Sequence, residues 1–246
     1  RLTPDDVRSI LRFAVVSLLI LPLLPDQGYG PYEALNPHRI WLMVVLISGM
    51  SLGGYLMLQL VGSNHGVTLM GLFGGMVSST ATTLAFARQV QADAGQLGNA
   101  QRVILLANIV VLLRIAALAI AVSRDALPSL LPTLAGGFIA GSAWVVWQLR
   151  NTGPAAKAEL RIAAPSQMRA ALSFAAFFAL VCVAVAWLQD HVGTQGVYLG
   201  AALSGLTDVD AISLSAMEMF ETQRLDGRAL ALTVLIAYVA NLMFKL

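Results

Sequence analysis

Residues 196–217 read GVYLGAALSGLTDVDAISLSAM, a stretch that is apolar at both ends and polar in its middle. Residues 66–87 read GVTLMGLFGGMVSSTATTLAFA and share this design, with hydroxyl side chains in place of the acids. Six of 22 positions are identical at an offset of 130 residues, against roughly two expected for this composition: Gly66/Gly196, Val67/Val197, Leu69/Leu199, Gly75/Gly205, Ala81/Ala211 and Leu84/Leu214. The pattern favours an internal duplication of an interrupted membrane helix.

The composition excludes a soluble domain. Charged residues make up 11% of the 246 residues and hydrophobic residues 58%, with a mean hydropathy of +0.76. Soluble proteins carry roughly 25% charged residues, because their surface faces water. The net charge of +2 is not the concentrated basic surface of a nucleic-acid-binding domain. We therefore expect an integral membrane protein that contacts lipid and binds no nucleic acid.

The predicted fold is an all-α, polytopic bundle of transmembrane helices with two related halves, each containing one interrupted helix that is broken or re-entrant. Residues 1–149 form the first half, with the interruption at 66–87. A polar linker spans 150–167, and residues 168–246 form the second half, with the interruption at 196–217. We expect the chain to be a fragment, truncated within its last helix. Apolar runs of about 20 residues, the length that crosses a bilayer, lie at 7–24, 40–61, 103–123, 127–149, 168–189 and 229–246.

Two topologies are compatible with this pattern. Re-entrant segments would make the halves inverted and place the N-terminus in the cytoplasm, whereas spanning segments would make them parallel and place it outside. Both versions put nine loop Lys and Arg residues inside and four outside, so the positive-inside rule does not choose between them.

Asp208 and Asp210 are the strongest candidates for function, because a carboxylate at membrane depth costs about 3 kcal/mol or more. If the chain is extended here, both carboxylates face one side and can ligate a metal cation together with Thr207. Close carboxylates would also share a proton. The structural alternative is that Thr207 to Asp210 forms a capping box for the following helix.

Polar side chains elsewhere complete the predicted site. Hydroxyls of the first interruption can line an ion path or bond back to their own helix; they are Ser78, Ser79, Thr80, Thr82 and Thr83. Asn108 and Asn241 are expected to brace broken backbone more than to bind an ion. Arg114 lies in an apolar run and should pair with Asp208 or Asp210, statically, as a partner that a cation displaces, or as an anion-binding group.

Glycines at small-xxx-small spacing allow close approach between helices. These pairs are Gly49/Gly53, Gly71/Gly75 and Gly137/Gly141. They serve packing within the chain or a homodimer, and the spacing alone does not separate the two.

Several stretches resemble a known family: Leu21–Asp26, Asn36–Trp41, Gly53–Tyr55, Gly74–Thr83 and Gly205–Ala211. The chain resembles the domain of unknown function that follows an MgtC/SapB-type membrane domain in bacterial inner-membrane proteins. The resemblance implies a bacterial inner membrane, a missing N-terminal MgtC-like domain and a link to divalent cations, especially magnesium. A weaker likeness, to cation/proton antiporters, rests on Ser78–Ala81 and Asp208–Asp210.

These patterns predict a secondary transporter or channel for inorganic cations, with the ion at the interrupted helices near the membrane midplane. The expected ligand is Mg2+ or a monovalent cation, with no other cofactor. The alternative is a non-transporting sensor or regulatory module that binds a partner protein. An ATP-binding loop and metal-hydrolase spacing are absent from the sequence, and no constellation indicates an enzyme.

Overall fold

The computed structural model describes residues 4–61, 67–92, 94–151 and 167–245. Regular structure in these residues is helical, and the one recorded β-type pairing is an isolated bridge between Tyr29 and Leu35. Runs of Leu, Ala and Val favour helices here, because lipid offers no hydrogen bonds and a helix satisfies its own backbone. The predicted all-α class is confirmed.

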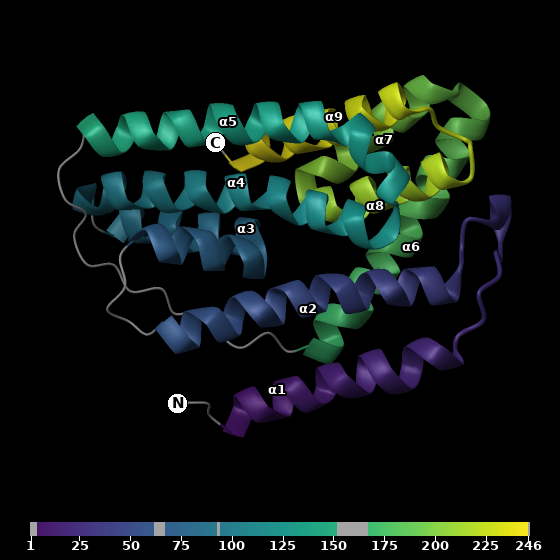
Figure 1. The fold of residues 1–246 in the computed structure, drawn as a ribbon, viewed down its shortest axis with the longest axis horizontal. Coiled ribbons are helices and arrows are strands. Elements are labelled where there is room, and N and C mark those ends of the chain that lie inside the picture. The colour runs from purple at the N-terminus through teal and green to yellow at the C-terminus, as the bar shows by residue number, and fades with distance from the viewer. Residues whose placement is uncertain (1–3, 62–66, 93, 152–166, 246) are drawn as a thin grey trace. The chain divides into compact units, whose positions relative to one another are not determined.

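The helices are shown in Figure 1. Short turns of 3-10 or π-helix flank the α-helices at Val16–Ile20, Leu21–Leu23, Pro31–Glu33, Ala94–Gln96 and Arg124–Ala126. The α-helices are α1 (Pro4–Val15), α2 (Pro37–Val61), α3 (Val67–Ala92), α4 (Leu97–Val122), α5 (Leu127–Asn151), α6 (Gln167–Val192), α7 (Thr194–Thr207), α8 (Val209–Glu221) and α9 (Gly227–Lys245).

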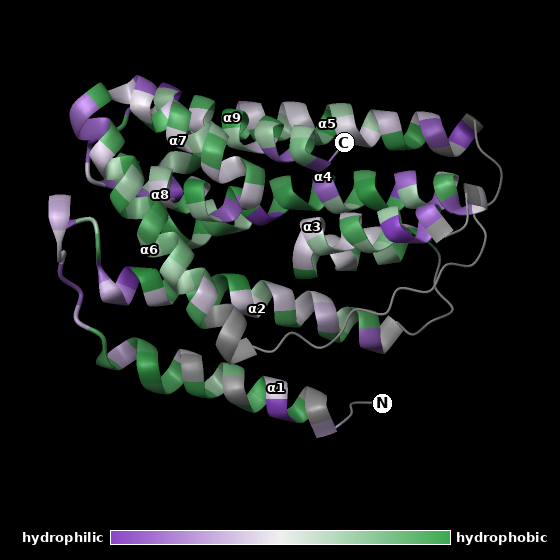
Figure 2. Cartoon of the chain, turned by 180° about the vertical axis from the view of Figure 1, so that it is seen from behind, coloured by the Kyte–Doolittle hydropathy of each residue, from purple (hydrophilic) through white to green (hydrophobic). Residues whose placement is uncertain are grey.

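Six of the described helical segments are long and apolar enough to cross a membrane: Pro37–Gln59, Val67–Gln91, Leu97–Val122, Arg124–Gln148, Leu172–Val192 and Gly227–Lys245. Figure 2 shows hydrophobic residues along most of α4 and α6. The span predicted at 7–24 is not among the six, because α1 is only 12 residues long and gives way to π and 3-10 turns. The chain is a multi-pass membrane protein.

The chain divides into two compact units. The first unit comprises Arg1–Ile10, Gly49–Arg114 and Leu134–Pro165, and it contains α3. The second unit comprises Leu11–Ser48, Ile115–Thr133 and Ser166–Leu246, and it contains α7 and α8. Residues 152–166 of the predicted linker lie outside the described residues, and the division into sequence halves at 149 and 168 stays a prediction.

One glycine in each unit allows two helix backbones to touch. In the first unit, a Cβ atom on Gly75 of α3 would lie 2.6 Å from the Cα of Ala107 in α4. In the second unit, a Cβ atom on Gly205 of α7 would lie 2.5 Å from the carbonyl oxygen of Ala237 in α9. Both positions therefore require the absence of a side chain.

The glycines of two predicted small-xxx-small pairs pack within the first unit. Added Cβ atoms on Gly71, Gly75, Gly137 and Gly141 would all meet atoms of α4. These pairs therefore serve intramolecular packing. Gly53 has open space at its Cβ position, and the homodimer stays a prediction.

Gly75→Ala and Gly205→Ala should each lower the melting temperature of the detergent-purified protein, because forcing apart a packed interface costs about 1–3 kcal/mol. Gly136→Ala is the matched control, since it adds the same methyl group inside α5 where no atom lies within 4 Å. Thermal unfolding of the three variants measures the difference. Equal melting temperatures would show that these close contacts are not required.

Candidate functional site

The helix α3 is interrupted at Ser78. Its dihedral angles, φ −169° and ψ 115°, are those of extended backbone, while the residues on both sides are helical. The Oγ of Ser78 accepts a hydrogen bond from the backbone N–H of Ala81 at 3.2 Å. Ser78 thus acts as an N-cap for the second arm of α3, residues 79–92.

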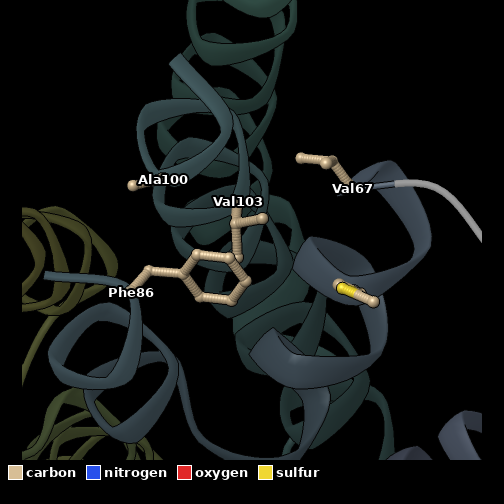
Figure 3. Close-up of a cluster of buried hydrophobic side chains, with 5 residues drawn as sticks. Val67, Phe86, Ala100 and Val103 are labelled. Carbon is tan, nitrogen blue, oxygen red and sulfur yellow. The ribbon is translucent and has the colours of Figure 1, made fainter. Parts of the chain in front are cut away.

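The two arms of α3 fold back on each other. Val67 of the first arm and Phe86 of the second arm belong to one buried cluster, with Met70 and with Ala100 and Val103 of α4. Figure 3 shows Val67 and Phe86 on separate helical segments beside Ala100 and Val103. In a straight helix Val67 and Phe86 would be separated by about 28 Å. Both ends of α3 therefore lie at the same end of α4.

The interruption frees backbone carbonyls at the end of the first arm, and polar side chains bind them. An Nη atom of Arg114 donates to the carbonyl oxygens of Gly75 at 3.4 Å and Met76 at 3.3 Å. The hydroxyl of Ser51 donates to the carbonyl of Val77 at 3.0 Å. A cation at the C-terminal end of a helix is electrostatically favourable. Pairing of Arg114 with an aspartate stays a prediction.

Other predicted polar residues of the first unit bond to their own helix. Thr83 Oγ1 donates to the carbonyl of Ser79 at 2.8 Å, and Asn108 Nδ2 donates to the carbonyl of Ile104 at 2.7 Å. Thr83 and Asn108 are both buried, whereas Thr80 is partly exposed. Bonding back to the preceding turn is the structural alternative that the sequence suggested for the hydroxyls.

In the second unit the chain is extended at Asp208, which separates α7 from α8. Its φ is −150° and its ψ is 124°. Oδ1 of Asp208 accepts hydrogen bonds from the backbone N–H groups of Asp210 at 2.7 Å and Ala211 at 3.1 Å. Asp208 is therefore the N-cap of α8, with its negative charge at the positive end of the helix.

Two details of the predicted acidic motif are wrong. The cap is Asp208 rather than Thr207, whose hydroxyl instead donates to the carbonyl of Ser204 at 2.9 Å. The backbone is extended only at Asp208, because α8 begins at Val209 and Asp210 already lies in its first turn. The carboxylate of Asp208 accepts hydrogen bonds from two backbone N–H groups, and Asp208 therefore caps α8 in preference to Thr207.

Asp210 is buried, with 7% of its surface exposed, and the residues around it in α8 are buried as well. At the carbonyl end of α7, Asn241 of α9 donates to the backbone oxygen of Gly205 at 2.8 Å. Asn241 thus has the bracing contact expected for it. The buried Asp210 therefore lies on the α8 side of the break at Asp208, and the Gly205 carbonyl that Asn241 binds lies on the α7 side.

The two ends of the α7–α8 segment also lie together. Thr194 and Tyr198, at the start of α7, line the same cavity of about 560 Å³ as Gln223, Arg224 and other residues that follow α8. Both helices pack against α6 and α9 (Figure 1). The chain therefore runs along α7, turns at Asp208 and runs back along α8, so that the end of α8 lies near the start of α7.

The end of α8 is held by polar contacts that the sequence did not reveal. Arg39, near the start of α2, pairs with Glu218 at 3.3 Å, and Ser123 donates a hydrogen bond to Glu221. Arg224 donates to the backbone oxygen of Tyr32 at 3.1 Å. These partners are separated by more than 90 positions, and no local pattern pairs them.

Three further buried hydroxyls lie near the two breaks; sequence analysis named Thr82 among its candidates and missed Ser204 and Ser213. Ser213 and Thr82 are fully buried and Ser204 is 9% exposed. None of the three hydroxyl oxygens has a hydrogen-bond partner in the part of the chain that is described. The sequence shows that these hydroxyls lie within about one turn of a break. It does not show that they lack a hydrogen-bond partner, because that depends on packing.

Asp208→Ala should destabilise the purified protein by about 1 kcal/mol through loss of the helix cap, whereas Asp208→Asn should not, because asparagine caps equally well. The measurement is thermal unfolding in detergent. Equal stability of the two variants would mean that the cap contributes nothing. Because Asp208→Asn removes the charge and keeps the cap, it separates structure from ion binding in functional assays.

Comparison with known proteins gives a family but no activity. An uncharacterised protein of Aquifex aeolicus (strain VF5) is 28% identical over 81 residues, which cover 33% of this chain and 35% of that protein. No solved structure matches the chain. The family model for a domain of unknown function, DUF4010, matches residues 45–246. The chain therefore belongs to the DUF4010 family.

Proposed function

We propose that this protein is a secondary transporter or channel for inorganic cations in a bacterial inner membrane, with the ion bound at the break between α7 and α8. The observation that carries the proposal is the buried carboxylate of Asp210 beside that break. Ionisable groups at membrane depth are expensive, and they mark ion and proton pathways. The family resemblance is the ground for the inner membrane and for an MgtC-like domain as a partner.

The proposed architecture is a duplication. α6 begins at Gln167 and α9 at Gly227, each 130 residues after the start of its counterpart, α2 at Pro37 and α4 at Leu97. Both extended residues, Ser78 and Asp208, and both close contacts, Gly75 with Ala107 and Gly205 with Ala237, follow the same offset. This agreement in geometry adds to the sequence identities that first suggested two halves. In transporters, substrates bind at breaks of this kind in repeated helices.

Both interrupted segments are proposed to be re-entrant hairpins. Support comes from Val67 and Phe86 in one cluster and from Thr194 and Gln223 at one cavity. If α4, α5 and α6 each cross the bilayer once, the second hairpin opens on the face opposite to the first. The halves would then be inverted, and one hairpin would open on each face of the membrane.

The chemistry at the second break suits a cation. The C-terminal end of α7 contributes the negative end of a helix dipole, and Asp210 adds a carboxylate in the first turn after the break. Asp208 offsets the positive end of α8 by capping it. A cation that leaves water can therefore exchange hydration for fixed oxygen ligands at this place.

Re-entrance predicts which membrane face reaches each loop. In a variant without its single cysteine (Cys182→Ala), we expect Thr194→Cys and Gln223→Cys to react with a membrane-impermeant thiol reagent from the same face. Leu97→Cys should react from the other face. Labelling of intact and inverted membrane vesicles measures this. Reaction of Thr194→Cys and Gln223→Cys from opposite faces would mean that α7 and α8 together span the membrane.

In proteoliposomes, Asp210→Asn should lower cation flux about tenfold or more, because a charge-assisted contact to the ion is removed. The double variant, Asp208→Asn with Asp210→Asn, should lower it at least as much. Flux of Na+, K+ and Mg2+ is measured with ion-sensitive dyes. The matched control is Asp190→Asn, an exposed aspartate at the end of α6, which should retain flux.

Unaltered flux in the double variant would remove both aspartates from the mechanism. Absence of flux of every cation in the folded wild-type protein would overturn transport and favour a sensor or regulatory module.

A further inference from the structure

A cavity with two arginines lies in the second unit, where the start of α7 meets the residues that follow α8. Its volume is about 560 Å³, and Arg224 and Arg228 line it together with one acid, Asp226. Oδ1 of Asp226 accepts a hydrogen bond from the backbone N–H of Ala229 at 2.7 Å, so this acid caps α9. The described lining residues carry one more positive charge than negative. This arginine cavity therefore suits an anion.

The other acids near Arg224 lie outside the arginine cavity. Glu33 and Glu218 line a separate cavity of about 110 Å³, which Arg224 also borders. Glu218 pairs with Arg39 at 3.3 Å, and Glu33 is exposed. Neither acid therefore cancels the positive charge inside the arginine cavity.

Neutral donors in the lining favour phosphate as the anion. Thr194, Tyr198 and Gln223 line the cavity with hydroxyl and amide groups, which can donate to phosphate oxygens. One Nη of Arg224 donates to the carbonyl of Tyr32 at 3.1 Å, and a guanidinium has five N–H donors in all. Arginine binds phosphate through two parallel hydrogen bonds. The remaining donors of Arg224 can therefore bind a phosphate group.

The arginine cavity lies at the level where a bilayer carries its phosphates. Two segments that can cross a membrane have an end here, because Leu172–Val192 stops just before Thr194 and Gly227–Lys245 starts just after Asp226. Trp187, in the last turns of α6, is 48% exposed, and tryptophan is enriched at membrane interfaces. Basic pockets between transmembrane helices at this level bind lipid headgroups.

An apolar groove adjoins Arg224. Its volume is about 570 Å³, and it includes Tyr32, whose backbone oxygen accepts the hydrogen bond from Arg224. Its other lining residues are mostly from α6, between Leu180 and Leu188, and Leu180 is 65% exposed. This α6 groove offers an apolar wall for an acyl chain, next to the arginine that can hold a phosphate.

We propose that the arginine cavity and the α6 groove bind one anionic glycerophospholipid, with its phosphate on Arg224 and Arg228 and an acyl chain in the groove. The inference goes beyond cation transport and does not depend on it, since lipid binding is measured on the purified protein. Inorganic phosphate shares the headgroup chemistry but has no acyl chain, so the two sources can be distinguished.

The test is thermal unfolding of the delipidated protein in a neutral detergent at constant ionic strength. The protein is titrated with phosphatidylglycerol, with phosphatidylcholine of the same chains, and with inorganic phosphate. Phosphatidylglycerol should raise the melting temperature in a saturable way, because a ligand that binds only the folded state stabilises it. Phosphatidylcholine should bind more weakly, because its headgroup carries a cation. Inorganic phosphate should give no saturable shift at the same concentrations.

Arg228→Gln and Arg224→Gln should each weaken the apparent affinity for phosphatidylglycerol about tenfold, through loss of a hydrogen bond to a charged group. The matched control is Arg124→Gln. Arg124 is an exposed arginine of the same unit that lines neither the arginine cavity nor the α6 groove. This control should keep wild-type affinity. Equal losses in Arg124→Gln and Arg228→Gln would indicate general attraction to a basic surface and overturn the site.

The groove is tested by filling it without a change of charge. Ala184 is an exposed residue that lines the α6 groove, so Ala184→Phe should fold normally and weaken phosphatidylglycerol affinity about fivefold through loss of apolar contact. Ala176→Phe makes the same change at an exposed position of α6 outside the groove and should keep wild-type affinity. Equal affinities of the two variants would overturn the assignment of the acyl chain.

Equal stabilisation by phosphatidylglycerol and phosphatidylcholine would overturn the inference, and so would a saturable shift with inorganic phosphate alone. A melting temperature that no lipid changes would also overturn it. The outcomes separate this site from transport. Absence of cation flux with arginine-dependent lipid binding would leave the lipid site standing, whereas cation flux with unchanged lipid affinity in both arginine variants would overturn the lipid site alone.

Discussion

A helix that stops inside a membrane exposes backbone groups that lipid does not satisfy, and each unsatisfied group costs several kcal/mol. In each unit of this protein, side chains meet that requirement. Arg114 and Ser51 bind the freed carbonyls of α3, and Asn241 binds the carbonyl of Gly205 in α7. These donors therefore offset part of the cost of each break.

The two breaks are built alike and charged differently. Ser78 and Asp208 are both extended, and each accepts a hydrogen bond from the backbone N–H three residues further on. The freed carbonyls are bound by the cationic side chain of Arg114 in the first unit and by the neutral amide of Asn241 in the second. The first break is therefore basic, and the second, which carries Asp208 and Asp210, is acidic. If the two segments are copies of one element, as we propose, the charge at the break is what distinguishes them.

Some corrections come from competition between neighbouring polar groups. Thr207 and Asp208 can both cap α8, and the sequence pattern favoured the threonine. The carboxylate takes two N–H groups, and the threonine hydroxyl then finds a carbonyl one turn back. Likewise, Thr83 and Ser213 are 130 residues apart, the offset of the proposed repeat, but only Thr83 bonds back to its own helix. Such choices depend on small differences in side-chain rotamer and packing, which a sequence does not contain.

From the sequence alone, the low charge and the lengths of the apolar runs determined a helical membrane protein, and the polar clusters within two of those runs predicted an interruption in each. Those features follow from the cost of placing polar groups in lipid, which acts on composition and needs no tertiary contact. Only the tertiary structure decided that the ends of each interrupted segment meet, because a break does not specify the angle of the turn. Tertiary packing places the arms, with Gly75 against Ala107 and Gly205 against Ala237, and in the described residues it leaves the hydroxyls of Thr82, Ser204 and Ser213 without a hydrogen-bond partner.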